Sequence, residues 1–415
     1  MVREMKHTEI GDIPADWELQ TFEETFSILS NNTLSRENLN NRGGAVRNIH
    51  YGDILTQFTE VLDCAKDDIP YVNDLSLLTS STQLLQDGDI VIADTAEDET
   101  VGKVTEVRGL RDGKVVAGLH TIPCRVKKGD FAPGWLGYYM NSHMYHDQIV
   151  PFITGIKVSS ISKSAMAETL IAVPPRDEQR EIIEMLSQID VLIQSQQKVS
   201  DKIAAVKLGC LSKMFPKEGK NIPEIRLSGF SDPWEQRKLG EICQVTMGQS
   251  PDGATYSDEP SDYILVQGNA DLKDGWVFPR IWTTQKTKTA QAYDLIMSVR
   301  APAGAIGKTA YDVVLGRGVA GIKGNEFIYQ SLAKFDADGY WKKIAAGSTF
   351  ESVNSDEVKN AIISIPQDIE EQEKIGEYFS NLDHFITLHQ HKLEKYKAIK
   401  QGMMNELLTG KIRLV

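Results

Sequence analysis

The chain has 415 residues, of which 41% are hydrophobic and 25% charged, and its formal net charge is −13. This composition is ordinary for a soluble globular protein, the length suggests two to four domains, and no apolar run approaches the ~20 residues of a membrane span. The N-terminus lacks the apolar core of a signal peptide, and the four cysteines show no C-x-x-C spacing, which argues against a disulfide framework and a structural zinc site. We therefore expect a cytoplasmic protein, and its negative charge argues against a nucleic-acid partner unless a local basic surface or a basic partner subunit is present.

The first globular unit is expected to span residues 1–172 and to combine strands with helices. Gly88–Asp94 is typical of a buried strand that follows a Gly-Asp turn. Val101–Val107 and Lys114–Val126 indicate further strands, and Gly134–Ile149 indicates a helix. The expected order is therefore strand, Gly-rich turn to strand, strand, helix.

Residues 173–215 predict one long helix. Pro174 and Pro175 suit a helix start, and the acidic side chains that follow suit the positive end of the helix dipole. Apolar residues recur at steps of mostly three and four, so that they form one stripe along the helix. The stripe contains Ile182, Leu186, Ile189, Ile193, Val199, Ile203 and Val206, with Gln196 as its one polar member.

Residues 216–364 form a Pro/Gly-containing linker and a second globular unit. Trp17 and Trp234 head matching segments of the two units. The order of strands and helix repeats in the second unit at Tyr293–Arg300, Gly304–Tyr311, Val314–Lys323 and Asn325–Phe335. Each unit therefore has an α+β pattern.

Residues 365–415 predict a second long helix and a C-terminal tail. Adding 193 to the first stripe gives Ile375, Phe379, Leu382, Ile386, Tyr396 and Ile399, with His389 at the place of Gln196. A repeat this far apart in the chain indicates a duplicated unit rather than a solenoid.

Each helix has roughly 38 residues and a length of about 57 Å, which favours a two-helix coiled coil. Because a globular unit lies between the helices in the sequence, the second helix must run back along the first if they pair over their full length. The predicted fold is α+β, with two globular units of mixed sheet and helices held apart by two antiparallel coiled-coil helices. Gln196 and His389 could meet midway and fix the register, or they could simply occupy a wet part of the seam.

The tripeptide Ile225-Arg226-Leu227 in the linker recurs at the C-terminus as Ile412-Arg413-Leu414. We therefore expect the C-terminal tail to return to the first unit in the way that the linker enters the second. The result would be a nearly circular molecule with a pseudo-twofold axis.

Several motifs fall short of a catalytic or metal site. Pro302–Thr309 is one residue from a phosphate-binding loop, but a proline replaces the first glycine and a strand rather than a helix follows. His143–His146 lacks acidic or cysteine partners for a metal, and Ala93–Thr100 lacks the spacing of a calcium loop. No methyl-donor-binding glycine motif, base-methylation motif or Ser/His/Asp set is present. We expect no catalytic residues, no metal and no cofactor.

The ordered set of motifs, repeated twice, resembles one family over essentially the whole chain. The two units open with WELQTF and WEQRKLGEI. They contain NIHYGDI, GDIVIAD, VAGLHT, DLIMSVRAPAGAIGKT and GRGVAGIK, and GIKVSSISKS and GSTFESVNSDE precede helices that carry RDEQREI and EEQEKI. This set resembles the specificity (S) subunit of type I restriction-modification enzymes. The resemblance implies two target-recognition domains that each read one half of a split double-stranded DNA site, with the helices as a spacer. It also implies two methylation (M) subunits along the helices and motor-nuclease (R) subunits in the full complex.

Candidate DNA contacts follow from basic, aromatic and polar residues on loops and strand ends. They are Arg42, Arg47, His50, Tyr51, Lys103, His120 and Lys157 in the first unit, and Arg300, Lys308, Arg317 and Thr349 in the second. Lys308 is expected to be exposed beside Arg300 and Arg317, and Lys103 and His120 are expected at places analogous to Lys308 and Arg317. For each residue, the alternative is an ordinary solvated side chain.

Three functions fit the sequence. The first is a non-catalytic DNA-recognition subunit. The second is a coiled-coil adaptor that joins two protein partners through its end domains without DNA specificity. The third is a stand-alone DNA enzyme, which activity of the isolated chain would reveal.

Overall fold

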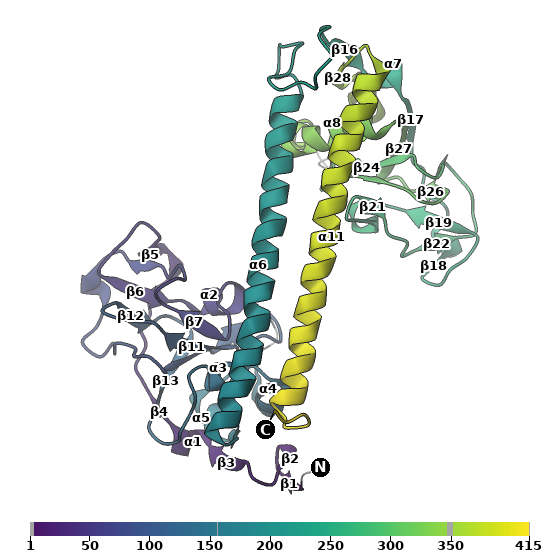
Figure 1. Ribbon diagram of the computed structural model, residues 1–415. Coiled ribbons are helices and arrows are strands. Elements are labelled where there is room, and N and C mark those ends of the chain that lie inside the picture. Colours follow the sequence, from purple (N-terminus) through teal and green to yellow (C-terminus); the bar gives the residue numbers. More distant parts are fainter. Residues whose placement is uncertain (1–3, 156, 347–351, 415) are drawn as a thin grey trace. The chain divides into compact units, whose positions relative to one another are not determined.

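The computed structural model describes residues 4–155, 157–346 and 352–414 (Figure 1). The chain divides into two compact units. Unit 1 comprises Met1–Gln194 and Glu394–Val415, and unit 2 comprises Ser195–Leu393. The helices α6 (Arg176–Met214) and α11 (Ile369–Leu407) contribute to both units. Among the described residues, no helix is long and apolar enough to cross a membrane.

Unit 1 is built from short strands and helices that precede α6. The strands are β1 (Met5–Thr8), β2 (Gly11–Pro14), β3 (Glu18–Thr21), β4 (Phe26–Ile28), β5 (Leu39–Asn40), β6 (Val46–Ile49), β7 (Val61–Asp63), β8 (Tyr71–Val72), β9 (Ile90–Ala93), β10 (Thr95–Ala96), β11 (Val104–Arg108), β12 (Lys114–Ala117), β13 (Thr121–Val126), β14 (Ser159–Ser160) and β15 (Leu170–Val173). The helices are α1 (Phe22–Thr25), α2 (Tyr51–Thr56), α3 (Trp135–Met140), α4 (His143–Ile149) and α5 (Lys163–Ala167). Its two main sheets have the orders β4-β13-β9-β11-β7 and β12-β6-β8-β5.

Unit 2 repeats this plan in the residues that lie between α6 and α11 in the sequence. Its strands are β16 (Glu235–Lys238), β17 (Gln244–Met247), β18 (Tyr256–Ser257), β19 (Tyr263–Val266), β20 (Leu272–Lys273), β21 (Trp276–Val277), β22 (Trp282–Thr283), β23 (Thr289–Ala290), β24 (Leu295–Ser298), β25 (Ile306–Lys308), β26 (Val313–Leu315), β27 (Val319–Lys323) and β28 (Ile362–Ile365). Its helices are α7 (Leu239–Ile242), α8 (Glu326–Ala337), α9 (Tyr340–Ala345) and α10 (Ser355–Asn360). The sheet orders are β17-β27-β24-β25-β21-β20 and β18-β22-β19-β26-β23.

The strands β9 and β24 are buried along their whole length, as their continuous apolar sequences predict. Successive side chains of a strand point to opposite faces. Ile90 and Ile92 accordingly lie in the core beside the long helices, whereas Val91 and Ala93 lie in the core that contains residues of the second sheet. The sheet that contains β9 is therefore packed on both faces, and every second residue of β9 faces the long helices.

Two expected elements of unit 1 are interrupted. The helix predicted over Gly134–Ile149 is two helices, α3 and α4, because Ser142 between them has an extended backbone (φ −78°, ψ 156°). The Asn141 side chain beside this break bonds both the N–H and the carbonyl of Val104 (3.0 and 2.8 Å). The predicted strand over Lys114–Val126 is also two strands, in different sheets. They are separated at His120, whose φ of +55° is a left-handed conformation that ends an extended run.

The strand register corrects one expected equivalence between the units. Ile90 pairs with Cys124 and Glu106, and Leu295 pairs with Ile322 and Lys308. Lys308 therefore corresponds to Glu106. The expectation that Lys103 takes its place is wrong, since Lys103 lies three residues away and three is not a multiple of the two-residue strand repeat. By the same register His120 corresponds to Gly318 rather than Arg317.

The long helices run antiparallel, as predicted. In unit 1 the core contains Ile182 and Leu186 from early α6 together with Met404 and Leu407 from late α11. In unit 2 the core contains Leu211 and Met214 from late α6 together with Ile375 and Phe379 from early α11. Both ends of the two helices are offset by 193, since 369 − 176 and 407 − 214 both equal 193.

The seam between the helices differs from the predicted stripe at three positions. Val199, Val206 and Ile399 are exposed, whereas Ser200 and Leu393 are buried. One series of partly buried and buried residues of α6 follows steps of four and three: Ile182, Leu186, Ile189, Ile193, Gln196, Ser200, Ile203, Lys207, Cys210 and Met214. This series has the 3.5-residue period of a coiled coil, and on α6 the prediction is one residue off at Val199 and Val206 but correct at Ile203.

Phe379→Ala tests the packing of this seam. Phe379 is fully buried in the core of unit 2, so we expect its truncation to lower the free energy of unfolding by about 3–5 kcal/mol. Phe385→Ala is the control on the same helix, because Phe385 is 49% exposed and its loss should change stability by less than about 0.5 kcal/mol. Urea unfolding measures both variants, and equal losses would contradict the assigned seam.

Candidate nucleic-acid interface and its supports

A buried glutamate at the start of each long helix joins three distant parts of the chain. In unit 1 the Glu178 carboxylate accepts hydrogen bonds from Trp17 Nε1 (3.1 Å) and from Arg413, which also bonds Asp16 (2.9 Å). Asp16 and Glu178 raise the pKa of Arg413, chiefly through their hydrogen bonds, so the guanidinium stays charged. The C-terminal tail thus returns to unit 1, as the repeated tripeptide predicts.

Unit 2 contains the same arrangement. The Glu371 carboxylate accepts from Trp234 Nε1 (3.3 Å) and from the Nε and Nη2 atoms of Arg226 (both 2.8 Å). Glu371 corresponds to Glu178 under the 193-residue shift, and Arg226 corresponds to Arg413 within the repeated tripeptide. The linker therefore enters unit 2 as the tail enters unit 1.

A second polar cluster lies further along the helices in each unit. In unit 1 the Asp190 carboxylate accepts from Tyr138 Oη (2.6 Å) and pairs with Lys400 (2.7 Å), and Lys400 also bonds Glu60 (2.6 Å). In unit 2 the Asp383 carboxylate accepts from Gln330 Nε2 (2.8 Å) and from Lys207.

Burial shifts the pKa values of two members of the cluster in unit 1. It raises the pKa of Asp190, and Lys400 and Tyr138 oppose that shift. Burial also raises the pKa of Tyr138, and the neighbouring Asp190 carboxylate adds to the effect. The phenol therefore stays protonated and serves as a donor.

Gln196 and His389 meet in unit 2. Their side chains are hydrogen-bonded, and Gln196 Nε2 also donates to the His389 carbonyl (3.2 Å). Because 196 + 193 equals 389, this contact joins two positions that are equivalent in the 193-residue repeat. A buried polar pair of this kind favours one register over its neighbours.

Three of the predicted DNA contacts of unit 1 form one aromatic cluster. The rings of His50 and Tyr51 lie 4.7 Å apart, and those of Tyr51 and His120 lie 5.3 Å apart. His120 Nδ1 is 3.3 Å from Thr95 Oγ1 and 3.4 Å from the Asp94 carboxylate. His120 is exposed, whereas His50 is buried, and burial lowers the pKa of His50. Tyr51 and His120 are thus the members that can reach a ligand.

The remaining candidates of unit 1 differ in accessibility. Arg42 and Lys157 are exposed. Arg47 is half-buried and donates to the Cys64 carbonyl. Lys103 is also half-buried, its Nζ donates to the Leu55 carbonyl (3.1 Å), and burial lowers its pKa. Arg47 and Lys103 therefore have structural partners, while Arg42 and Lys157 face solvent.

In unit 2 the expectation for Lys308 is wrong. Lys308 pairs with Leu295, at the opposite end of β24 from Arg300, and its side chain is only 15% exposed. Its Nζ lies 2.9 Å from Glu326 and 4.9 and 4.8 Å from the rings of Trp276 and Tyr329. Lys308 lies on the face of the sheet that packs against the long helices, because it pairs with Leu295, and Leu295 belongs to the core on that face.

Arg300 and Arg317 are exposed near one end of the sheet. Arg300 lies two residues beyond Ser298, and Ser298 pairs with Val319, which lies two residues after Arg317. Thr349 lies outside the described residues. The structure therefore brings two arginines to one edge of unit 2.

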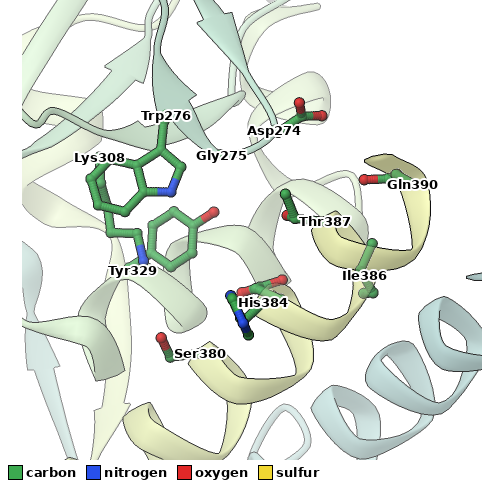
Figure 2. Close-up of a pocket in the computed structure, with 11 residues that line it drawn as sticks. Asp274, Gly275, Trp276, Lys308, Tyr329, Ser380, His384, Ile386, Thr387 and Gln390 are labelled. Atoms are coloured by element: carbon green, nitrogen blue, oxygen red, sulfur yellow. The ribbon is translucent and has the colours of Figure 1, made fainter. Parts of the chain in front are cut away.

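The other side of unit 2 has a cleft of about 360 Å³ between the β20–β21 turn and α11 (Figure 2). Its walls include Trp276, Lys308, Tyr329, Asp383 and His384. Lys308 N donates to the Gly275 carbonyl as Glu106 N donates to the Glu60 carbonyl (both 2.9 Å). Gly275 thus stands where unit 1 has Glu60.

A side chain at Gly275 would not fit. Its φ is +76°, and an added Cβ would lie 2.7 Å from Tyr329 Oη. Gly275 therefore lines the cleft with its backbone alone.

Sequence reasoning missed the side chains that join the helices to the sheets. Tyr138 and Gln330 belong to apolar helices and differ between units, so no repeat marks them. Lys207 and Lys400 could have been found, because they are related by the same shift that relates Asp190 and Asp383. Within residues 4–155, 157–346 and 352–414, no group of three or more His, Cys, Asp or Glu side chains could hold a metal ion.

Comparisons with known proteins agree on one kind of molecule. A family model described as "Type I restriction modification DNA specificity domain" matches residues 14–205 and 231–398. A Methanocaldococcus jannaschii protein named as the type I restriction enzyme MjaX specificity subunit is 28% identical over 423 residues, which cover 99% of this chain and 96% of that protein. The MjaVIII specificity subunit of the same organism is 22% identical over 281 residues, covering 63% of this chain and 66% of its own.

Two solved structures share the fold. The S subunit of a type I restriction-modification system from M. genitalium has a TM-score of 0.57 at 14% identity, covering 98% of this chain and 99% of its own. A chain from a study of complex assembly and conformational transition in a type I system has a TM-score of 0.57 at 19% identity, covering 96% and 99%.

Proposed function

The chain belongs to the family of type I restriction-modification DNA specificity domains, and on that premise we propose that it reads a split DNA site, with one half-site for each unit. It carries no catalytic step of its own in this proposal. It positions cytoplasmic partner subunits that methylate or cleave the DNA, and we expect no resident cofactor or metal.

The duplication carries this proposal. The family model matches twice, once in each half of the chain, and the main sheets of the two units have the same strand order except for the added β20 and β23. The hydrogen-bonded clusters around Glu178 and Glu371 repeat in the two units, whereas the sequences of the loops at the strand ends differ. Two readers with common supports and different loops suit a target made of two unlike half-sites at a fixed separation, for which the long helices serve as the spacer.

The proposed readers are exposed side chains on the loops. In unit 2 they are Arg300 and Arg317, since arginine can donate two hydrogen bonds to guanine. In unit 1 they are Tyr51 and His120, with Arg42 and Lys157 as phosphate contacts. Thr349 stays a predicted contact of the second half-site.

The proposed methylation subunits dock on a second stripe of the helices. Met185, Leu192, Val199 and Val206 are 40, 47, 38 and 46% exposed and recur every seven residues on α6. The same shift leads to Tyr378, Phe385 and Ile399 on α11, which are 37, 49 and 41% exposed. An exposed apolar stripe with coiled-coil period suits a partner helix, and its duplication suits two copies of that partner. Motor-nuclease subunits would complete the complex.

The split-site proposal is tested by binding to duplexes that carry each half-site, in complex with the methylation subunits. We expect Arg300→Ala and Arg317→Ala each to weaken binding at the second half-site by about 1–3 kcal/mol if they read bases, and to leave the first half-site unchanged. Lys220→Ala, at an exposed linker lysine, is the control. Equal losses at both halves would contradict one reader per half-site, and no preferred split sequence at any salt concentration would favour the protein adaptor.

The partner proposal predicts a stepwise loss of stoichiometry. A charge in an apolar docking stripe is costly to desolvate, so Leu192→Asp or Phe385→Asp alone should leave one methylation subunit bound, and the double variant none. Light scattering of the purified complexes counts the subunits. Unchanged folding is checked by thermal unfolding of the free chain, and full binding by the double variant would exclude the stripe as the docking surface.

A further inference from the structure

Each unit contains a polar link between the paired helices and the sheet-bearing part of the unit. Asp190 on α6 joins Lys400 on α11 to Tyr138 on α3. In unit 2, Asp383 on α11 joins Lys207 on α6 to Gln330 on α8. The aspartates correspond under the 193-residue shift, and so do the lysines.

Tyr138 and Gln330 occupy equivalent positions, although they differ chemically. The Trp135 ring packs edge-on against Trp17 at 6.2 Å, and the Phe327 ring packs edge-on against Trp234 at 5.6 Å. Tyr138 and Gln330 each follow three residues later, one helical turn along. Two diverged units have therefore placed a hydrogen-bond donor at the same point, opposite the same carboxylate.

These links resist a motion that the apolar contacts tolerate. Hydrophobic contact is non-directional, so the sheet-bearing part of a unit can rotate slightly about the helices with little loss of burial. Hydrogen bonds of 2.6 and 2.8 Å to a carboxylate weaken steeply with distance and angle. Gln330 is fully buried, and Lys400 and Asp190 are only 13 and 14% exposed, so water replaces a lost partner poorly.

We propose that Tyr138 and Gln330 are positioning residues that fix the rotation of the sheet-bearing part of each unit about the paired helices. Through this rotation they set the gap, the number of base pairs between the two half-sites, that the complex accepts. This inference rests on the proposed function. Neither residue touches DNA in it. Each acts through its aspartate, and the readout is the selectivity for gap length rather than for base sequence.

The two links differ in strength. Glu60 gives Lys400 a second carboxylate in unit 1. In unit 2, Gly275 stands at the place of Glu60 and offers no side chain, and the cleft of Figure 2 opens beside Gly275. Loss of the link should therefore relax unit 2 more than unit 1.

The test uses the full complex with methylation subunits and duplexes whose half-sites are separated by the preferred gap or by one base pair more or less. For the unaltered protein we expect clear preference for one gap. Tyr138→Phe removes only the hydroxyl. Gln330→Leu removes the amide, and with it the bond to Asp383 and a bond to Glu326 within α8 (2.9 Å). We expect each to reduce the gap preference by roughly 3- to 10-fold, with the larger effect for Gln330→Leu, and to leave discrimination against altered half-site bases unchanged.

Two variants separate positioning from general stability. Tyr139 is equally buried, but its hydroxyl accepts from Ala172 N (3.0 Å) rather than bonding the helices, so Tyr139→Phe should destabilise the chain without altering gap preference. Tyr138→Gln places the donor of unit 2 in unit 1 and should retain the preference.

The outcomes distinguish this inference from the function on which it rests. Unaltered gap preference in both Tyr138→Phe and Gln330→Leu, or an equal change in Tyr139→Phe, would overturn the positioning role while leaving split-site recognition intact. Absence of any split-site preference in the unaltered complex would overturn both. If Tyr138→Phe does not fold, Gln330→Leu and the retained preference of Tyr138→Gln decide the question.

Discussion

The core of each unit depends on side chains from both long helices, which approach from opposite directions. Unit 1 buries early α6 with the last turns of α11, and unit 2 buries late α6 with the first turns of α11. Neither unit closes its helix-side core with one helix alone, so antiparallel pairing is a condition of folding rather than an addition to it. The arginine clusters on Glu178 and Glu371 act in the same sense, because each ties a distant segment to a helix start.

Part of the positive charge of the chain is used within the fold. Lys207, Lys308, Lys400, Arg226 and Arg413 all belong to ion pairs with low side-chain exposure. These side chains hold the helices and sheets together and are not presented to a phosphate backbone. In the proposed function, DNA contact by this chain therefore rests on a few exposed arginines and aromatic side chains, and the long-range electrostatic attraction falls to its partner subunits.

The helices were predictable from the sequence, and the contacts of the sheets were not. A 193-residue shift relates the two long helices in the sequence, and it also relates the observed bounds of α6 to those of α11. The repeated tripeptide likewise predicts the return of the tail to unit 1. The sequence analysis places Lys103 at the position analogous to Lys308, whereas the hydrogen-bond register aligns Lys308 with Glu106. Strand register is set by pairing between distant segments, and a shift by three residues moves a side chain to the other face of the sheet.

In the proposed function the paired helices determine the separation of two DNA readers, and one measurement tests this role directly. Insertion of ~7 residues, two helical turns, at equivalent points of both helices would add about 10.5 Å. Sequencing of the methylated sites made by the altered complex would report the result. If the helices set the separation, we expect unchanged half-site sequences with a gap longer by about three base pairs, at 3.4 Å per base pair. An unchanged gap, or altered half-site sequences, would contradict it.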